Sequence, residues 1–216
     1  MKVVVTREPR GAERLARRLR SAGFEAVTCP LIRIERVEGP PVRAEEYDWL
    51  VLTSRAAVEP LFARLEGALP RVAVVGPGTA EAVRARGVEP ALVARRSTQE
   101  GIVAELPRPP GRVLFAGAEG ARDTLVRELG ADFVALYRTV EETPARFPQA
   151  DLVVLASASA ARSFARLGLA TPCVSIGPVT SGEARRHGIE VVSEAESHDV
   201  EGLVSAVKLA ASVIAS

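Results

Sequence analysis

The chain has 216 residues, of which 47% are hydrophobic and 25% charged, a composition typical of a globular protein with one large domain or two small ones. Its 28 basic and 27 acidic residues leave a net charge of +1, so no overall field attracts nucleic acid or a membrane surface, and an anionic ligand must be bound locally. The two cysteines, Cys29 and Cys173, stand alone in apolar segments, which argues against a metal site, a redox pair or a disulfide framework.

The beginning of the chain predicts a strand, a helix and a second strand in a cytoplasmic protein. Residues 3–5 form a short apolar run that is followed at once by Thr6 and Arg7, and we expect neither a signal peptide nor a membrane-spanning segment. Between residues 12 and 22 apolar side chains recur at helical spacing, and residues 27–34 form a second extended segment.

Two breaks rich in proline and glycine divide the rest of the chain. Residues 39–41, Gly-Pro-Pro, predict a loop or a crossing between domains, and residues 48–52 predict the next strand. Residues 107–111 form the clearest linker. After it the same order of elements begins again, with an apolar strand at residues 151–155 that repeats residues 48–52.

One stretch of the chain is written twice. Each copy predicts an apolar strand, a Gly-Pro turn, a helix, a glycine stop, a second strand and a second helix. Three glycines recur 101 residues later without a gap: Gly76, Gly87 and Gly101 return as Gly177, Gly188 and Gly202. The repeat by itself, 1–106 and 111–216, suggests two modules that divide at residues 107–111.

Continuous apolar strands separated by helices indicate parallel sheets that are covered on both faces. Counting the strands in the two halves gives five in each. The sequence therefore predicts an α/β protein made of two similar doubly wound parallel-sheet domains. In such folds the turns that lead from strand to helix lie at the carboxyl edge of the sheet, where ligands bind.

The usual catalytic signatures are missing. Gly76-Pro77-Gly78 lacks the third glycine of a dinucleotide fingerprint, and the chain has no Gly-Lys-Ser/Thr phosphate loop. Neither histidine has a partner that suggests a triad or a zinc site, because His187 is expected at a helix C-terminus and His198 in a loop. We therefore expect no metal and no cofactor. The enzyme classes that remain are those in which the protein mainly shapes a reactive substrate.

Small polar residues recur at the predicted turns from strand to helix. Such turns present backbone N–H groups and hydroxyls to an anion, although any single one is an ordinary helix cap. Six of them at the same sheet edges, spread over two domains, predict a donor-lined cleft suited to a polycarboxylate. The six turns are Thr6-Arg7, Thr53-Ser54-Arg55, Gly76-Pro77-Gly78-Thr79, Gly117-Ala118-Glu119-Gly120, Ser157-Ala158-Ser159 and Gly177-Pro178-Val179-Thr180.

Several of these segments form one larger pattern by their order and spacing. They are the paired Gly-Pro-x-Thr segments, residues 48–58 with Leu-Thr-Ser-Arg-Ala-Ala-Val, Tyr137-Arg138-Thr139, residues 155–164, and residues 175–180 followed by Val-Glu-Gly-Leu-Val at 200–204. Together they resemble the uroporphyrinogen-III synthases, the HemD family, over nearly the whole chain.

The resemblance implies two similar α/β domains joined by a pair of extended strands. The first domain would be discontinuous, with residues 1–35 and 142–216, and the second would comprise residues 38–138. The two connections would lie near residues 35–41 and 138–145. This division replaces the simple split at residues 107–111 that the repeat alone suggests.

The resemblance also implies a reaction. Hydroxymethylbilane, a linear tetrapyrrole with carboxylate side chains, would be cyclised with inversion of ring D to uroporphyrinogen III, in tetrapyrrole biosynthesis, by a lyase without cofactor or metal. The substrate would lose its hydroxyl, close through a spiro intermediate, fragment and close again. Because closure without inversion is spontaneous, the work of such an enzyme is chiefly conformational control and assisted loss of hydroxide.

The site residues follow from the resemblance and from the turns. Tyr137 matches the tyrosine that assists departure of the hydroxyl in the family, and its alternative role is a strand-end tyrosine packed on the hinge. The expected substrate-binding residues are Thr6, Arg7, Thr53, Ser54, Arg55, Gly76, Ser157, Ala158, Ser159, Ser175, Gly177 and Thr180.

Two rivals from other classes stay open at this point. One is a two-domain cytoplasmic protein that binds a small anion without catalysis, and the other is a regulatory or structural module derived from the synthase. The expected partner is a small-molecule polycarboxylate, with neither nucleic acid nor membrane, and the expected state is a monomer.

Overall fold

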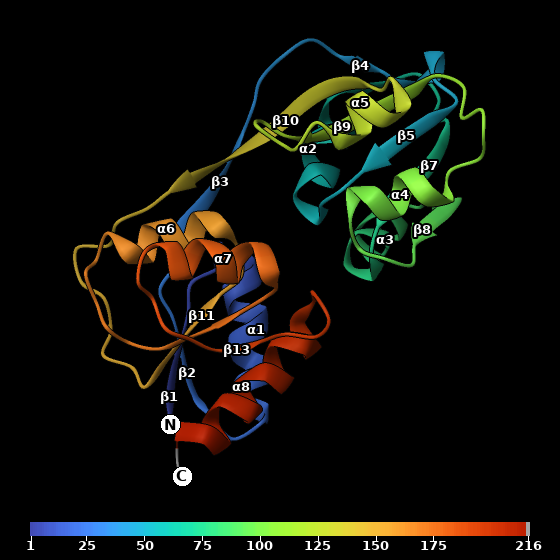
Figure 1. The fold of residues 1–216 in the computed structure, drawn as a ribbon. Helices are drawn as coiled ribbons and strands as arrows, with labels where there is room; N and C mark the ends of the chain where they lie inside the picture. The colour runs from blue at the N-terminus through green and yellow to red at the C-terminus, as the bar shows by residue number, and fades with distance from the viewer. Residues whose placement is uncertain (215–216) are drawn as a thin grey trace. The chain divides into compact units, whose positions relative to one another are not determined.

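A computed structural model describes residues 1–214 of the chain. The chain divides into two compact units: unit 1 is Met1–Arg33 with Thr139–Ser216, and unit 2 is Ile34–Arg138. Each unit has its own sheet and its own hydrophobic core (Figure 1). The expected domain boundaries, 1–35 with 142–216 and 38–138, stay a prediction.

The sheet of unit 1 has five strands in the order β13-β12-β11-β1-β2, and all neighbouring strands are parallel. The strands are β1 (Lys2–Val5), β2 (Glu25–Thr28), β11 (Leu152–Leu155), β12 (Cys173–Ser175) and β13 (Val191–Glu194). They are nearly continuous apolar runs because both faces of the sheet are covered. The parallel five-stranded sheet expected here is confirmed.

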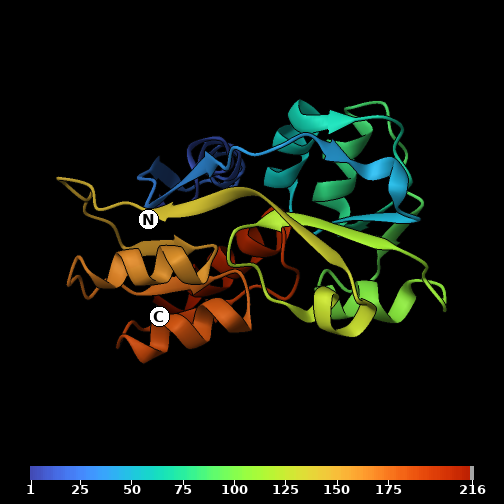
Figure 2. The same cartoon turned by 90° about the horizontal axis from the view of Figure 1, so that it is seen from above.

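Four helices cover the two faces of this sheet. They are α1 (Pro9–Ser21), α6 (Ala158–Ala165), α7 (Pro178–Arg186) and α8 (Val200–Ile214). Side chains of a strand alternate between the faces, so Val3 packs with α1 and α8 whereas Val4 packs with α6 and α7. Helices α6 and α7 lie side by side over their face (Figures 1 and 2).

The sheet of unit 2 has six strands, in the order β3-β10-β9-β5-β7-β8, where five were expected. The strands are β3 (Ile32–Arg36), β5 (Trp49–Leu52), β7 (Arg71–Val75), β8 (Leu92–Ala94), β9 (Val113–Ala118) and β10 (Asp132–Glu141). The additional strand is β3. Residues 27–34 were expected to form one extended segment of the first domain, but β2 ends at Thr28 and β3 begins at Ile32 and runs into the expected connection near residues 35–41. A connecting strand with open N–H and C=O groups gains hydrogen bonds by joining a sheet edge, and this explains the difference.

The pairing of β3 with β10 is antiparallel. The N–H of Val37 donates to the carbonyl of Leu136 over 3.0 Å, and the N–H of Glu142 donates to the carbonyl of Leu31 over 2.8 Å. The residue numbers run in opposite directions along the two strands, as an antiparallel ladder requires. The chain therefore enters and leaves unit 2 through two paired strands.

Helices also cover both faces of the second sheet. They are α2 (Val58–Arg64), α3 (Pro77–Arg84), α4 (Gln99–Glu105) and α5 (Thr124–Leu129). The first two pack with one face and the last two with the other. Short elements complete the unit: β4 (Val42–Arg43) pairs with β6 (Leu65–Glu66), and the 3-10 helices are η1 (Ala44–Glu46) and η2 (Arg55–Ala57).

The repeated glycines have a structural reason. Helices α4 and α8 begin equivalently, because Thr98 accepts a hydrogen bond from the N–H of Gly101 and Asp199 accepts one from the N–H of Gly202, over 3.1 and 2.8 Å. A Cβ at Gly101 would lie 2.2 Å from the carbonyl oxygen of Arg96, and the same clash arises at Gly202. The loop before each helix therefore lies directly on the first turn of that helix, and only glycine leaves room for it.

Candidate active site

The strongest pairing of predicted site residues lies at the carboxyl edge of unit 2. The hydroxyl of Tyr137, on β10, donates to the hydroxyl of Ser54 over 2.9 Å. Ser54 follows β5 and also accepts a hydrogen bond from the N–H of Ala56 over 3.0 Å, which caps η2. The structure thus brings together two residues that the sequence predicted separately, 83 positions apart.

Burial sets the protonation state of this pair. Tyr137 is only 7% exposed and packs with the core of unit 2. Burial raises the pKa of the Tyr137 phenol, and the hydrogen bond with Ser54 offsets part of that rise. The phenol therefore keeps its proton at neutral pH. Because Tyr137 donates to Ser54, the hydroxyl proton of Ser54 remains available for a third group.

Arg55 braces the neighbouring turn of unit 2. Its Nε donates to the carbonyl of Gly78 over 3.0 Å, and its guanidinium pairs with Glu81 over 2.8 Å. Gly78 lies in the first turn of α3 and Glu81 in its middle. The side chain expected to bind substrate directly is thus already bonded to this helix, although 44% of it is exposed.

The turn at Gly76 is shaped by its backbone. Gly76 has a φ of 74°, in the left-handed region that favours glycine, and a Cβ there would lie 2.6 Å from the hydroxyl of Ser97. As the cap of α3 it supplies no side-chain acceptor. The first N–H groups of α3 have no partner within the helix, so they can donate to an anion. Thr53 belongs to the other turn of this unit, the one after β5 that contains Ser54, and it is half-buried.

In unit 1 the predicted turn after β11 is a helix cap. The hydroxyl of Ser157 accepts a hydrogen bond from the N–H of Ala160 over 3.1 Å and caps α6. The hydroxyl of Ser159 accepts one from the guanidinium of Arg162 over 3.2 Å. Ser157, Ser159 and Ala158 between them are half-buried. The structure thus places these residues at the carboxyl edge, with both hydroxyls bonded inside the unit.

Other predicted hydroxyls of unit 1 point into the protein. Thr6 is fully buried, and its hydroxyl donates to the carbonyl of Val154 over 2.7 Å. Thr180 is 3% exposed. Arg7, after Thr6, is half-buried and has partners of its own. The turns were located from the sequence, but the hydroxyls of Thr6 and Thr180 do not line an open surface in this structure.

Ser175 belongs to a buried chain of hydrogen bonds that sequence reasoning missed. Its hydroxyl lies 2.5 Å from that of Ser181, and Ser181 donates to the carboxylate of Glu194. Both serines are fully buried. A signal was present in the repeat, since the residues 101 positions earlier are all apolar: Val74, Ala80 and Val93.

The Gly177 turn has a histidine beside it. His198, in the loop between β13 and α8 as predicted, is exposed, and a Cβ at Gly177 would lie 2.7 Å from its Nε2. Gly177 is the cap of α7 and, like Gly76, supplies no side-chain acceptor. The equivalent neighbour of Gly76 is Ser97. His187 ends α7, as predicted, and lies 3.4 Å from Glu183.

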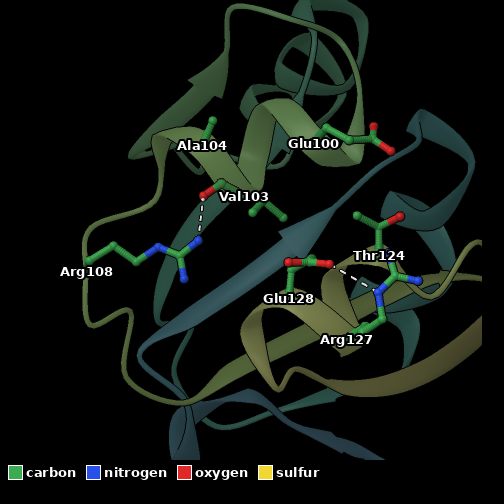
Figure 3. Close-up of a pocket in the computed structure, with 7 residues that line it drawn as sticks. All are labelled: Glu100, Val103, Ala104, Arg108, Thr124, Arg127 and Glu128. Atoms are coloured by element: carbon green, nitrogen blue, oxygen red, sulfur yellow. Dashed lines mark hydrogen bonds and ion pairs between the residues drawn. The ribbon is translucent and has the colours of Figure 1, made fainter.

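Two hollows of the surface lie away from these turns. One, of about 400 Å³, lies between α4 and α5 (Figure 3), and its lining is Glu100, Val103, Ala104, Arg108, Thr124, Arg127 and Glu128. In this hollow Arg108 donates to the carbonyl of Val103, and Arg127 pairs with Glu128. The other, of about 500 Å³, lies at the amino ends of β1 and β11, beside Lys2 and Asp151. Neither contains a predicted site residue.

The remaining reactive groups do not form a centre. Cys29 and Cys173 are buried free thiols, and burial raises the pKa of both, that of Cys173 to about 12. Residues 1–214 contain no group of three or more histidine, cysteine or carboxylate side chains that could hold a metal ion. Over the same residues, no helix combines the length and apolar character needed to cross a membrane.

Comparison with known proteins identifies the family. The family profile described as uroporphyrinogen-III synthase HemD matches residues 13–205. The chain belongs to this family. The resemblance expected from the order of the motifs is therefore confirmed, and it extends over most of both units.

Individual members of the family are distant relatives. A uroporphyrinogen-III synthase of Synechococcus elongatus is 26% identical, covering 95% of this chain and 94% of that protein. A protein of Methanocaldococcus jannaschii described as a putative uroporphyrinogen-III synthase is 28% identical, covering 65% of this chain and 63% of its own length. The chain thus spans just under two thirds of the second relative and nearly all of the first.

Solved structures of the family share the fold. The uroporphyrinogen-III synthetase of Helicobacter pylori has a TM-score of 0.70 at 18% identity, covering 98% of this chain and 99% of that one. A mutant uroporphyrinogen III synthase of Thermus thermophilus has a TM-score of 0.64 at 17% identity, covering 99% of both chains. The two-domain α/β architecture predicted from the sequence is that of this family.

Proposed function

We propose that the chain is a uroporphyrinogen-III synthase, a cyclising hydro-lyase that converts hydroxymethylbilane to uroporphyrinogen III with inversion of ring D. The observation that carries the proposal is the hydrogen-bonded pair of Tyr137 and Ser54 at the carboxyl edge of unit 2, in a chain of the HemD family. The reaction begins with loss of a hydroxyl group, and such a pair is suited to assist it.

The pair supplies a neutral donor for the departing hydroxyl. Hydroxide is a poor leaving group, so a hydrogen bond that strengthens as the C–O bond breaks lowers the barrier. Burial raises the pKa of Tyr137, so the phenol stays protonated and donates to Ser54. This polarises the Ser54 hydroxyl, whose own proton is then donated to the leaving oxygen. Tyr137 and Ser54 thus act as one relay.

The glycine turns provide binding for the carboxylates. Helices α3 and α7 both open on a glycine without a side-chain cap, which leaves first-turn N–H groups for acetate and propionate oxygens. Binding several carboxylates at fixed turns orients the reacting rings, and this is the contribution expected where an uncontrolled closure competes. Thr180 lies buried in the first turn of α7, whereas the hydroxyl of Thr6 donates to Val154 within the sheet of unit 1.

The decisive experiment is a product analysis. The protein is incubated with freshly prepared hydroxymethylbilane, and the uroporphyrinogen isomers are separated after oxidation. We expect the type III isomer to exceed the type I isomer formed spontaneously in a blank without protein. A protein that binds the bilane but leaves the type I isomer as the product would instead be the anion-binding alternative.

We also propose that catalysis needs neither metal nor cofactor and takes place in the cytoplasm in a monomer. The absence of a predicted nucleotide fingerprint or phosphate loop supports the first part. Formation of the type III isomer is expected to continue unchanged after treatment with EDTA and gel filtration. Loss of activity that a divalent metal restores would contradict it, and light scattering of the same sample measures the oligomeric state.

A further inference from the structure

Three side chains from three elements of unit 1 form one chain of hydrogen bonds. Ser175 ends β12, Ser181 lies in the first turns of α7, and Glu194 ends β13. The hydroxyls of Ser175 and Ser181 are 2.5 Å apart, and the hydroxyl of Ser181 contacts the carboxylate of Glu194. This series of hydrogen bonds therefore connects the beginning of α7 with the carboxyl ends of β12 and β13.

The direction of these hydrogen bonds is fixed by chemistry. An ionised carboxylate can only accept, so Ser181 donates to Glu194. Having used its only proton, Ser181 must accept from Ser175. Both serines are fully buried, whereas Glu194 is exposed to solvent. The carboxylate thus keeps contact with water while it orients two hydroxyls inside the protein.

Strand pairing places this contact. Ser175 lies opposite Glu194 in the β12–β13 ladder, and the equivalent residues of unit 2, Val74 and Val93, lie opposite each other in the β7–β8 ladder. In unit 2 these two side chains pack in one cluster with Ala80 of α3. The same strand positions therefore meet the following helix in both units, and unit 1 carries hydroxyls and a carboxylate there.

Unit 2 shows that the fold does not need these hydrogen bonds. The residues 101 positions earlier, Val74, Ala80 and Val93, occupy the same places in β7, α3 and β8. They belong to the apolar core of that unit. Apolar side chains thus suffice to build the module, and the polar chain of unit 1 has another role.

These hydrogen bonds hold the turn at Gly177. Helix α7 opens there without a side-chain cap. Val179, in the first turn, is an apolar side chain with 73% of its surface exposed. Fully satisfied buried polar networks fix one geometry more sharply than apolar contacts, which tolerate sliding.

We propose that Ser175, Ser181 and Glu194 form a positioning network that fixes the first turn of α7 for binding the substrate. The three side chains act through the turn, by holding its N–H groups and Val179 in one orientation before the bilane arrives. This inference rests on the proposed function for the identity of the ligand. It assigns to unit 1 a preorganised binding turn and leaves the leaving-group chemistry to Tyr137 and Ser54 of unit 2.

The test uses single substitutions in the full-length protein, each with a matched control. Ser181→Ala and Glu194→Gln break the network, whereas Ser205→Ala and Glu196→Gln change the same residue types at exposed positions outside it. We expect the first two to raise KM for hydroxymethylbilane about tenfold with kcat within about twofold, and the controls to match the wild type. The double variant Ser181→Ala/Glu194→Gln is expected to resemble either single variant, because both remove one network.

A swap separates positioning from folding. The variant with Ser175→Val, Ser181→Ala and Glu194→Val copies the apolar trio of unit 2 and is expected to fold, with a raised KM. The backbone N–H of residue 181 donates to the carbonyl of Gly177 over 3.0 Å, and its hydrogen exchange is expected to quicken in this variant and in Glu194→Gln, but not in Glu196→Gln. A wild-type KM and unchanged exchange would overturn the inference. If the wild type forms no type III isomer, the proposed function fails, while hydrogen exchange still tests the network.

Discussion

In unit 2 the turn at Gly76 lies beside Ser97 and is braced by Arg55, whereas in unit 1 the equivalent turn at Gly177 lies beside His198 and is tied down by buried serines. The backbone features are shared: a Gly-Pro opening, an uncapped first turn and a loop laid on the next helix. The side chains have diverged. The shared part suits a shared task, binding carboxylates by N–H groups, and the diverged part indicates a division of labour.

The donor pair belongs to unit 2 alone. Ser54 and Ser157 are equivalent caps after β5 and β11, yet only Ser54 receives a hydrogen bond from a tyrosine. The chain has two tyrosines, Tyr47 and Tyr137, and both lie in unit 2. The comparison therefore predicts that chemistry fails when unit 2 is changed and that binding fails when either unit is changed.

The largest effect is expected from Tyr137→Phe. Removing the phenol hydroxyl leaves the N–H of Ala56 as the donor to Ser54 and breaks the relay. The kcat for type III formation is then expected to fall about a hundredfold to a thousandfold, as for a lost oxyanion donor. Steady-state kinetics with isomer separation measures it. The matched control is Tyr47→Phe, which removes the hydroxyl that donates to Asp132 over 3.0 Å at the surface of the same unit. Full activity of Tyr137→Phe would make Tyr137 a packing residue.

The equivalent caps sharpen the contrast between the units. Ser54→Ala and Ser157→Ala each remove a helix cap and are expected to lower the free energy of unfolding by about 1 kcal/mol. Only Ser54→Ala is expected also to lower kcat, by about tenfold or more, because Ser54 alone belongs to the relay. Urea unfolding and kinetics on the same preparations check both parts. Equal losses of kcat in the two variants would contradict the division of labour.

The glycine turns differ in the strain that a side chain would meet. Gly76 has a φ of 74°, so Gly76→Ala is expected to lower the free energy of unfolding by about 1–2 kcal/mol. Gly177 has a φ of 165°, which any residue adopts, and its obstacle is only the exposed imidazole of His198, so Gly177→Ala is expected to cost about 0.5 kcal/mol or less. Urea unfolding of the two variants measures the difference. The reverse order would show that His198 is held rigidly.

The smallest effect is expected from an ion pair at the beginning of α4, which has a counterpart at the beginning of α8. Glu100 pairs with Arg122 in unit 2, and the equivalent Glu201 pairs with Arg18 in unit 1. The hydrogen bond from Arg122 lowers the pKa of Glu100 to about 2, and the hydrogen bond from Arg18 lowers the pKa of Glu201. A carboxyl group with a lowered folded-state pKa adds stability above its ordinary pKa, and this stability is lost as the pH falls toward the folded value.

For Glu100 the loss falls between about pH 4.5 and pH 2. The side chains of Glu100 and Arg122 are 45% and 59% exposed, so solvent screening limits the contribution to about 0.5 kcal/mol. Urea unfolding of Glu100→Gln and the wild type is expected to differ at pH 6 and to converge near pH 2. A difference that grows on acidification would have the wrong sign.

Much of the fold could be predicted from the sequence because glycine and proline mark where its elements end. The repeat located the turns at Gly76 and Gly177, and the apolar runs located the parallel strands. The six-stranded sheet was not foreseen, because residues 27–34 were predicted as one extended segment of the first domain, and nothing in their sequence shows that residues 32–36 join the second sheet. Backbone hydrogen bonds to β10 decide that, and they depend on tertiary contact.

The site was predicted by position more than by contact. Tyr137 and Ser54 were both named, but a hydrogen bond across 83 positions depends on the order of β9 and β10 in the sheet. Thr6 was named for its hydroxyl, which turns inward to Val154 because residues of a strand end alternate between faces. Glu194 was missed because its contact with Ser181 depends on how α7 packs against β12 and β13, which the sequence of residues 191–194 does not reveal.

The insertion of unit 2 between the halves of unit 1 also sets an order of assembly during synthesis. β1 (Lys2–Val5) occupies an inner place in its sheet, between β11 and β2. Its neighbour β11 comprises residues 152–155. After β1 leaves the ribosome, it therefore lacks this partner strand until the whole of unit 2 has been synthesised. Unit 2 is uninterrupted and can close its core first, as domains fold in order of emergence. The first apolar strand to be synthesised is therefore among the last to be enclosed.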